Sequence, residues 1–323
     1  MQDIAQVVIK KITEAREKHR PSRDWNAAHR AGAECARELT YWRLKPEAAL
    51  PEDPELQLIF EHGRWMEKES LAQLAAAGYE LSEQDAGFDW EAMRLRGRID
   101  TKVRLEGKKR PVEIKGYHPN IWEKLNTIDD FLKSDKPWLR KVPGQLLSYI
   151  LCDKGGDNDT AILYLLNKSS GRPKSVMLHL EGDTLEWGEA MLKRLEVVNK
   201  SVTAGVLPER IEFEESGCGL CPFRGDCLKD IPALEGPSRL SEEKQAELLA
   251  LLQERDALAS SKKKYESVDK AVSAMVKGIP KILVGDFLVV GKEIPVKEFT
   301  VKARTDWRKN ITNLKAKQAP DEE

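Results

Sequence analysis

The sequence contains no hydrophobic run long enough to cross a membrane. Its longest uninterrupted apolar stretch, residues 161–166, falls far short of the roughly 20 residues that a transmembrane helix requires. The first residues also lack the apolar core and small-residue cleavage site of a secretory signal peptide. We therefore expect a soluble, cytoplasmic protein with no membrane partner.

Cysteine is also scarce, with 5 in 323 residues. A chain of this length can bury a core without disulfides, so these residues are not needed as a disulfide framework. Their uneven spacing instead favours metal or cofactor chemistry in a reducing compartment.

Neither sign of charge dominates, because 53 basic residues face 54 acidic ones and the net charge is −1. This balance excludes a protein that binds nucleic acid through its overall charge. Two segments are nevertheless basic: residues 102–141 have 11 Lys and Arg against 6 Asp and Glu, and residues 259–317 have 14 against 6. They fit an oriented surface for a polyanion, but solvated faces balanced by acidic neighbours explain them equally well.

Hydrophobic periodicity predicts a mixed succession of helices and strands. The predicted helices are residues 4–12, a segment that begins after Ser22 or Asp24 and carries Cys35 and Tyr41, and residues 55–77, 138–152 and 184–202. The predicted strands are residues 88–99, continued by Val103 and Leu105, and residues 112–115, 161–166 and 175–180. This order is typical of an α/β domain in which helices pack on a sheet.

The composition changes after Pro232 and Pro237, so we place a domain boundary near residue 236. The two predicted domains are residues 1–236 and 237–323. For the second we expect a charged helical region from Leu240, a second helix to residue 276, and two strands joined at Gly291, over residues 281–290 and 296–303.

One predicted hairpin carries a concentrated set of charged residues. Asp100 ends the first strand, and a turn near Lys108 brings it close to Glu113 on the second. Glu113 and Lys115 are two residues apart on a strand and therefore share a face. Two carboxylates and an ammonium suit a divalent cation with oxygen ligands, including the backbone carbonyl of Ile114. An exposed strand with alternating charges would show the same spacing.

Around this hairpin the chain resembles the PD-(D/E)XK nuclease superfamily, specifically its RecB-type branch. The resemblance lies in GRID at residues 97–100, VEIK at residues 112–115, and the Q-x-x-x-Y pair Gln145 and Tyr149. It covers about residues 24–230 and implies a restriction-endonuclease-like mixed sheet flanked by helices, with Mg or Mn as cofactor. In this family the five residues Asp100, Glu113, Lys115, Gln145 and Tyr149 act in catalysis or contact DNA.

HGRWMEKE, residues 62–69, resembles the family's helix motif, in which a metal-binding His follows a glycine by four residues. That position is Glu67 here, so the sequence departs from the commonest pattern. The resemblance implies a metal site formed by Glu67, Asp100, Glu113 and Ile114. Its all-oxygen ligands favour Mg or Mn over softer metals.

Three cysteines, Cys218, Cys221 and Cys227, lie within ten residues in a loop rich in Gly and Pro. With Cys35 they resemble the four ligands of a [4Fe-4S] cluster in iron–sulfur RecB-type nucleases, which include the CRISPR spacer-acquisition nuclease. A zinc ion would suit the same four thiolates. Cys152 is left over and is predicted to be a small buried residue.

The basic C-terminal region lies outside this resemblance, although it loosely resembles accessory tails of phage-type recombination nucleases. It would bind DNA phosphates through residues 262–264, Lys297, Lys302, Arg304, Arg308 and Lys309. Trp307 would stack on an unpaired base. Alternatively, the helices serve contact with a second copy of the chain or with a recombination partner protein, and Trp307 is part of a core.

Together these features predict a metal-dependent DNA nuclease, most simply an exonuclease of recombination, repair or phage DNA processing, acting on single- or double-stranded DNA. The alternatives are a CRISPR spacer-acquisition nuclease, a catalytically silent DNA-binding or assembly protein that keeps the nuclease fold, and a zinc-stabilised scaffold with no role on DNA. The presence of Asp100, Glu113 and Lys115 together argues against the silent protein.

Overall fold

The protein is described by a computed structural model, which covers residues 3–4, 7–11, 24–50, 54–152, 159–229, 240–258, 262–296 and 304–313. The chain divides into two compact units, residues 1–217 with 321–323, and residues 218–320. The predicted domain boundary at residue 236 lies outside the described residues. No helix in the described ranges is long and apolar enough to cross a membrane.

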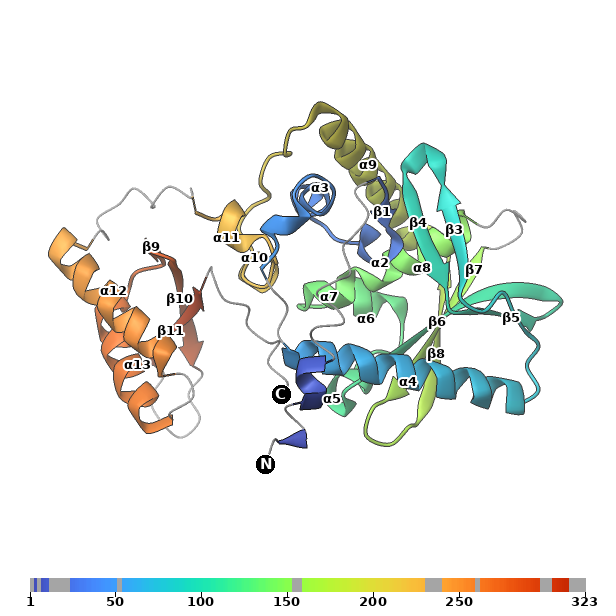
Figure 1. The fold of residues 1–323 in the computed structure, drawn as a ribbon, viewed down its shortest axis with the longest axis horizontal. Helices are drawn as coiled ribbons and strands as arrows, with labels where there is room; N and C mark the ends of the chain where they lie inside the picture. Colours follow the sequence, from blue (N-terminus) through green and yellow to red (C-terminus); the bar gives the residue numbers. More distant parts are fainter. Residues whose placement is uncertain are drawn as a thin grey trace. The chain divides into compact units, whose positions relative to one another are not determined.

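A five-stranded mixed sheet forms the centre of the first unit (Figure 1). Its strands, in spatial order, are β2 (Leu81–Ser82), β5 (Thr101–Leu105), β6 (Lys108–Tyr117), β7 (Thr160–Asn167) and β8 (Pro173–His179). β6 and β7 are parallel, and the other neighbouring pairs are antiparallel. The predicted α/β class, with a mixed sheet flanked by helices, is confirmed.

Helices cover both faces of this sheet, because alternate residues of its central strands are apolar on each face. Ile114 and Ile162 belong to a cluster with Met66 of α4 (Pro54–Ala76). On the other face, Leu163 packs in a larger core with Leu146 of α8 (Val142–Leu151) and with α9 (Gly182–Ala204). Figure 1 shows α4 and α8 on opposite sides of the sheet. Each such buried aliphatic side chain contributes about 1.5–3 kcal/mol to folding.

A second, three-stranded sheet adjoins these elements in the first unit. Its order is β1 (Asn26–Ala27), β4 (Leu95–Ile99) and β3 (Ala86–Trp90). The predicted continuous strand over residues 88–99 is therefore wrong, since η2 (Glu91–Met93) and the left-handed Arg94 (φ 47°) turn the chain between β3 and β4. Val103 and Leu105 do not extend β4, because β5 belongs to the other sheet. Asp100 lies at the bend between the two sheets.

The remaining helices of the first unit are mostly short. They are α2 (Ala28–Ala31), α3 (Ala36–Leu44), η1 (Pro46–Ala48), α5 (Pro119–Trp122), α6 (Ile128–Leu132), α7 (Pro137–Arg140) and α10 (Glu215–Cys218). The predicted helix over residues 138–152 corresponds to α7 and α8, and the predicted long helices correspond to α4 and α9. Of the predicted N-terminal helix, residues 7–11 are helical, whereas Ile12 lies outside the described residues.

Two glycines allow α8 to pack directly against the N-terminal segment. A Cβ on Gly144 would lie 2.5 Å from the Cα of Gly32, and a Cβ on Gly32 would lie 2.2 Å from the carbonyl oxygen of Lys141. These obstacles are backbone atoms, which cannot rotate away as a side chain can. Larger residues at either position would therefore separate α8 from the segment that leads to Cys35.

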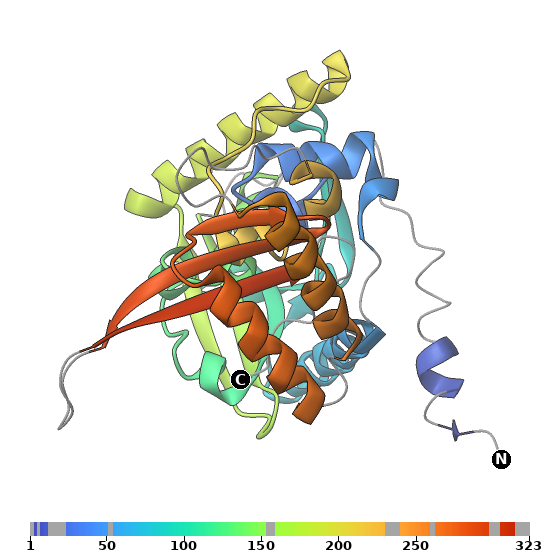
Figure 2. The same cartoon turned by 90° about the vertical axis from the view of Figure 1, so that its left-hand side faces the viewer.

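The second unit contains α11 (Arg224–Cys227), α12 (Glu242–Ala257), α13 (Lys262–Val276) and a three-stranded antiparallel sheet. The sheet consists of β9 (Lys281–Val284), β10 (Phe287–Val296) and β11 (Arg304–Asn313), in the order β11-β10-β9. Figure 2 shows α12 and α13, in orange, packed across this sheet. The predicted helical and hairpin appendage is confirmed in its element types.

The predicted strand boundaries in this unit were wrong. Residues 281–290 do not form one strand, because Gly285 adopts a positive φ of 58° and forms a two-residue turn with Asp286 between β9 and β10. Gly291 does not join two strands but lies within β10, opposite Lys309. The predicted strand over residues 296–303 falls mainly on residues 297–303, which are outside the described ranges.

Candidate active site

The β5–β6 hairpin positions Asp100 beside the strand that carries Glu113. Its turn is formed by Glu106 (φ 51°) and Gly107 (φ 79°), slightly earlier than the predicted turn near Lys108. Two positive φ angles are typical of the type I′ turn that matches the twist of paired strands. The side-chain oxygen Oδ2 of Asp100 accepts a hydrogen bond from the backbone N–H of Ile114 at 2.7 Å. The hairpin therefore fixes this carboxylate directly next to Glu113 in the sequence of β6.

Glu113 is the centre of a connected set of polar side chains. It is 1% exposed, and its two carboxylate oxygens have different partners. Lys115 Nζ donates to Oε1, and the Tyr149 hydroxyl donates to Oε2. Gln145 Nε2 in turn donates to the Tyr149 hydroxyl at 2.6 Å. Gln145 and Tyr149 are four residues apart on α8 and so lie on the same side of that helix.

Electrostatics at this site reflect a surplus of negative charge in a poorly solvated place. Burial raises the pKa of Asp100 to about 8, and the Glu113 carboxylate raises it further than Lys115 lowers it. Burial and the charge of Glu113 also raise the pKa of Glu67, which reaches this region from α4. For Lys115, burial alone would lower the pKa, but the carboxylates of Glu113 and Asp100 outweigh burial and raise it.

These carboxylates have the chemistry of a divalent-cation site. Oxygen ligands suit Mg and Mn, and a cation would offset the mutual repulsion that raises the pKa of Asp100 and Glu67. Within the described ranges, however, no three His, Cys, Asp or Glu side chains are grouped closely enough to hold a metal ion. No hydrogen bond or ion pair among the described residues joins Glu67 to Asp100 or Glu113.

Sequence analysis missed one cation on this side of α8. Lys141 precedes Gln145 by four residues and Tyr149 by eight, so all three follow one helical face. Burial lowers the pKa of Lys141, Glu38 opposes this shift, and the charge of Lys115 adds to it. The i, i+4, i+8 spacing from Lys141 to Tyr149 was visible in the sequence, where the pair Gln145 and Tyr149 was recognised alone.

The predicted cysteine ligands lie in both units. Cys35 is not inside a helix, as predicted, but is the N-cap of α3, where its Sγ accepts the backbone N–H of Glu38 at 3.4 Å. Cys218 ends α10, Cys221 lies in the following loop, and Cys227 ends α11. The five cysteines form no disulfide. The leftover Cys152 is the C-cap of α8, packs against the main core, and has a pKa raised to about 12 by burial.

Cationic side chains lie near three of the four predicted cysteine ligands. Burial lowers the pKa of each cation, and a neighbouring cysteine charge opposes this shift in every case. The pairs are Arg194 with Cys35, Lys281 with Cys218, and Arg224 with Cys221. Positive neighbours favour the thiolate form that metal binding requires, so the four sulfur donors suit a thiolate-ligated metal group.

Lys309, one of the basic residues predicted to contact phosphate, has a different role in the second unit. Its side chain is 10% exposed, and Nζ forms an ion pair with Asp269 of α13 at 3.0 Å. Asp269 also accepts from Arg255 Nε of α12 at 2.8 Å. Lys309 thus ties β11 to the helices. Lys297 and Lys302 lie outside the described residues.

Comparison with known proteins assigns no family. No protein-family model matches the chain, and no curated protein matches it. Among solved structures, the crystal structure of SSO0001 is similar at 14% identity and a TM-score of 0.41, over 74% of this chain and 99% of that chain. An alkaline exonuclease (LHK-Exo) from Laribacter hongkongensis is similar at 14% identity and a TM-score of 0.36, over 60% of this chain and 95% of that chain.

Proposed function

We propose that the chain is a Mg- or Mn-dependent deoxyribonuclease whose active site is the β5–β6 hairpin. The observation that carries this proposal is the buried Glu113, which is paired with Lys115, held by Tyr149 and adjacent to the strand position that binds Asp100. A surface strand with alternating charges does not explain a carboxylate that is 1% exposed. Buried charges of this kind concentrate at functional sites.

Each residue has a distinct role in this proposal. Glu67, Asp100, Glu113 and the carbonyl of Ile114 would hold the metal. When bound, the metal polarises the phosphate and lowers the pKa of a water molecule. Lys115 orients the attacking water, and the Tyr149 hydroxyl fixes the orientation of the Glu113 carboxylate. Gln145 fixes the Tyr149 hydroxyl in turn.

The first experiment is incubation of end-labelled single- and double-stranded DNA with the full chain. We expect degradation with Mg or Mn and none with EDTA, and the label pattern will distinguish exonuclease from endonuclease and give the polarity. Binding without cleavage in either metal would refute the nuclease and support the catalytically silent DNA-binding protein.

Gly63 offers a test of where the DNA strand runs. It lies one turn before Glu67 in α4, and nothing lies within 4 Å of a Cβ placed there. Gly63→Ala should therefore raise the free energy of unfolding by about 0.5–1 kcal/mol, because alanine favours the helix. If the strand passes over this open position, the same change should lower DNA hydrolysis about tenfold through misplacement. Urea unfolding and initial rates measure the two effects, and unchanged rates would place the strand elsewhere.

For the cysteines we propose a [4Fe-4S] cluster ligated by Cys35, Cys218, Cys221 and Cys227, in a reducing, cytoplasmic compartment. The C-x2-C-x5-C spacing, the absence of disulfides among the five cysteines and the cationic neighbours support this ligand set. Zinc is the competing occupant. Iron and sulfide analysis with visible absorbance of anaerobically purified protein decides between them, since a colourless preparation with one zinc per chain would exclude the cluster.

A further inference from the structure

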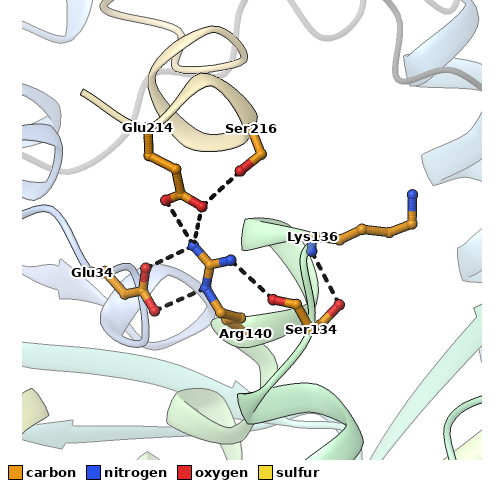
Figure 3. A network of polar contacts seen from close by, with 6 residues as sticks. All are labelled: Glu34, Ser134, Lys136, Arg140, Glu214 and Ser216. Atoms are coloured by element: carbon orange, nitrogen blue, oxygen red, sulfur yellow. Dashed lines mark hydrogen bonds and ion pairs between the residues drawn. The ribbon is translucent and has the colours of Figure 1, made fainter. Parts of the chain in front are cut away.

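Arg140, the last residue of α7, binds two carboxylates that are distant in sequence (Figure 3). Its Nε and Nη2 donate to the two oxygens of Glu34, both at 2.9 Å. Nη2 also donates to the two oxygens of Glu214, at 3.1 and 2.9 Å. Nη1 donates to the backbone carbonyl of Ser134 at 3.0 Å. The guanidinium thus connects three separate segments through charge-assisted bonds.

This arrangement differs from an ordinary surface ion pair. The Arg140 side chain is only 12% exposed, and both carboxylates are about two-fifths exposed. The Ser216 hydroxyl donates to Glu214 at 2.7 Å, and this bond together with Arg140 lowers the pKa of Glu214. A planar guanidinium with its fork of donors can bridge two carboxylates, which the single ammonium of lysine cannot do in the same geometry.

The two bridged segments are those that lead into the predicted metal ligands. Glu34 immediately precedes Cys35, and Ser216 lies two residues before Cys218 in α10. Arg140 lies 106 residues from Glu34 and 74 residues from Glu214, so chain connectivity does not bring these segments together. Fixing the backbone next to both ligands removes conformational freedom that metal binding would otherwise have to restrict.

We propose that Arg140 is a positioning residue for the four-cysteine site, holding the segments before Cys35 and Cys218 through Glu34 and Glu214. This inference rests on the proposed metal role of the cysteines. Arg140 touches no ligand itself and acts through the two glutamates. It also immediately precedes the start of α8, so the same contact fixes these segments to the helix that carries Gln145 and Tyr149.

The test compares metal retention in wild type, Arg140→Gln, Arg140→Lys and a matched control. The control is Arg104→Gln on β5, because Arg104 forms a similar fork with Glu80, through Nε at 2.6 Å and Nη2 at 3.1 Å, that contacts no cysteine-bearing segment. Iron and zinc per chain are measured after anaerobic purification, followed by the rate of metal release to EDTA. We expect 10- to 100-fold faster release from Arg140→Gln, about the effect of losing a residue that orients metal ligands. Arg140→Lys should retain part of the wild-type behaviour, and the control should match wild type.

Two failures are distinguishable. A wild type that holds neither iron nor zinc would overturn the four-cysteine site and the role of Arg140 with it. A loaded wild type that releases metal no more slowly than Arg140→Gln would overturn the positioning role alone. Should Arg140→Gln not fold, Glu214→Gln keeps the Arg140–Glu34 fork and is expected to release metal faster than wild type. Equal release from Glu214→Gln would likewise overturn the proposal.

Discussion

Replacing Glu113 by glutamine should slow metal-dependent DNA hydrolysis about a thousandfold, or about 4 kcal/mol in activation free energy. Glutamine keeps the shape of the side chain and one oxygen that can accept from Tyr149. It removes the negative charge that pairs with Lys115 and that a divalent cation would require. The loss should therefore appear in the chemical step rather than in folding.

The measurement is the single-turnover rate on end-labelled DNA in Mg, with DNA binding measured separately in EDTA. Glu196→Gln provides the control, since Glu196 is exposed on α9, away from β6. Binding by Glu113→Gln should match that of wild type. A variant that still cleaves DNA within a few-fold of the wild-type rate would exclude this hairpin as the active site.

In EDTA the free energy of unfolding should fall as the pH rises from about 5 to 8, and Asp100→Asn should remove much of this dependence. The pKa of Asp100 is raised to about 8 in the folded state, mainly by burial and by Glu113. Between its ordinary value and pH 8, the folded state holds a proton that the unfolded state has released. Stability therefore decreases with rising pH, by up to about 1.4 kcal/mol per pH unit for one proton.

Urea unfolding at several pH values, for wild type and Asp100→Asn in parallel, measures this difference in slope. Contributions from other titrating groups are common to both proteins and cancel in the comparison. Adding Mg should stabilise wild type more at pH 8 than at pH 6, because a cation competes with the proton. Identical pH slopes for the two proteins would show that Asp100 is ionised in the metal-free fold.

The long elements were predictable because their signals are local. Helical spacing of apolar residues located α4 and α9, and alternation within β6 placed Glu113 and Lys115 on one face, as their ion pair requires. The errors also have local causes. The turn at Gly285 and Asp286 carries a recognisable turn sequence, yet its apolar flanks resemble one uninterrupted strand.

The assignment of strands to sheets was not predictable from these signals. Residues 95–105 read as one strand, but hydrogen bonding distributes them between two sheets with Asp100 at the bend. Pairing partners are chosen by contacts between distant segments, and periodicity within one segment carries no information about them. The bridge from Arg140 to Glu34 and Glu214 was invisible for the same reason.

The sequence by itself determined the α/β class, the candidate residues on β6 and α8, and the cysteine spacing, because each depends on residues close together along the chain. Only the tertiary structure decided that Glu113 is buried between Lys115 and Tyr149, that Lys141 shares their side of α8, and that Lys309 is paired within the second unit. Burial and ion pairing depend on which surfaces meet in the folded chain. That outcome is set by the packing of α8 on the sheet and of β11 against α13.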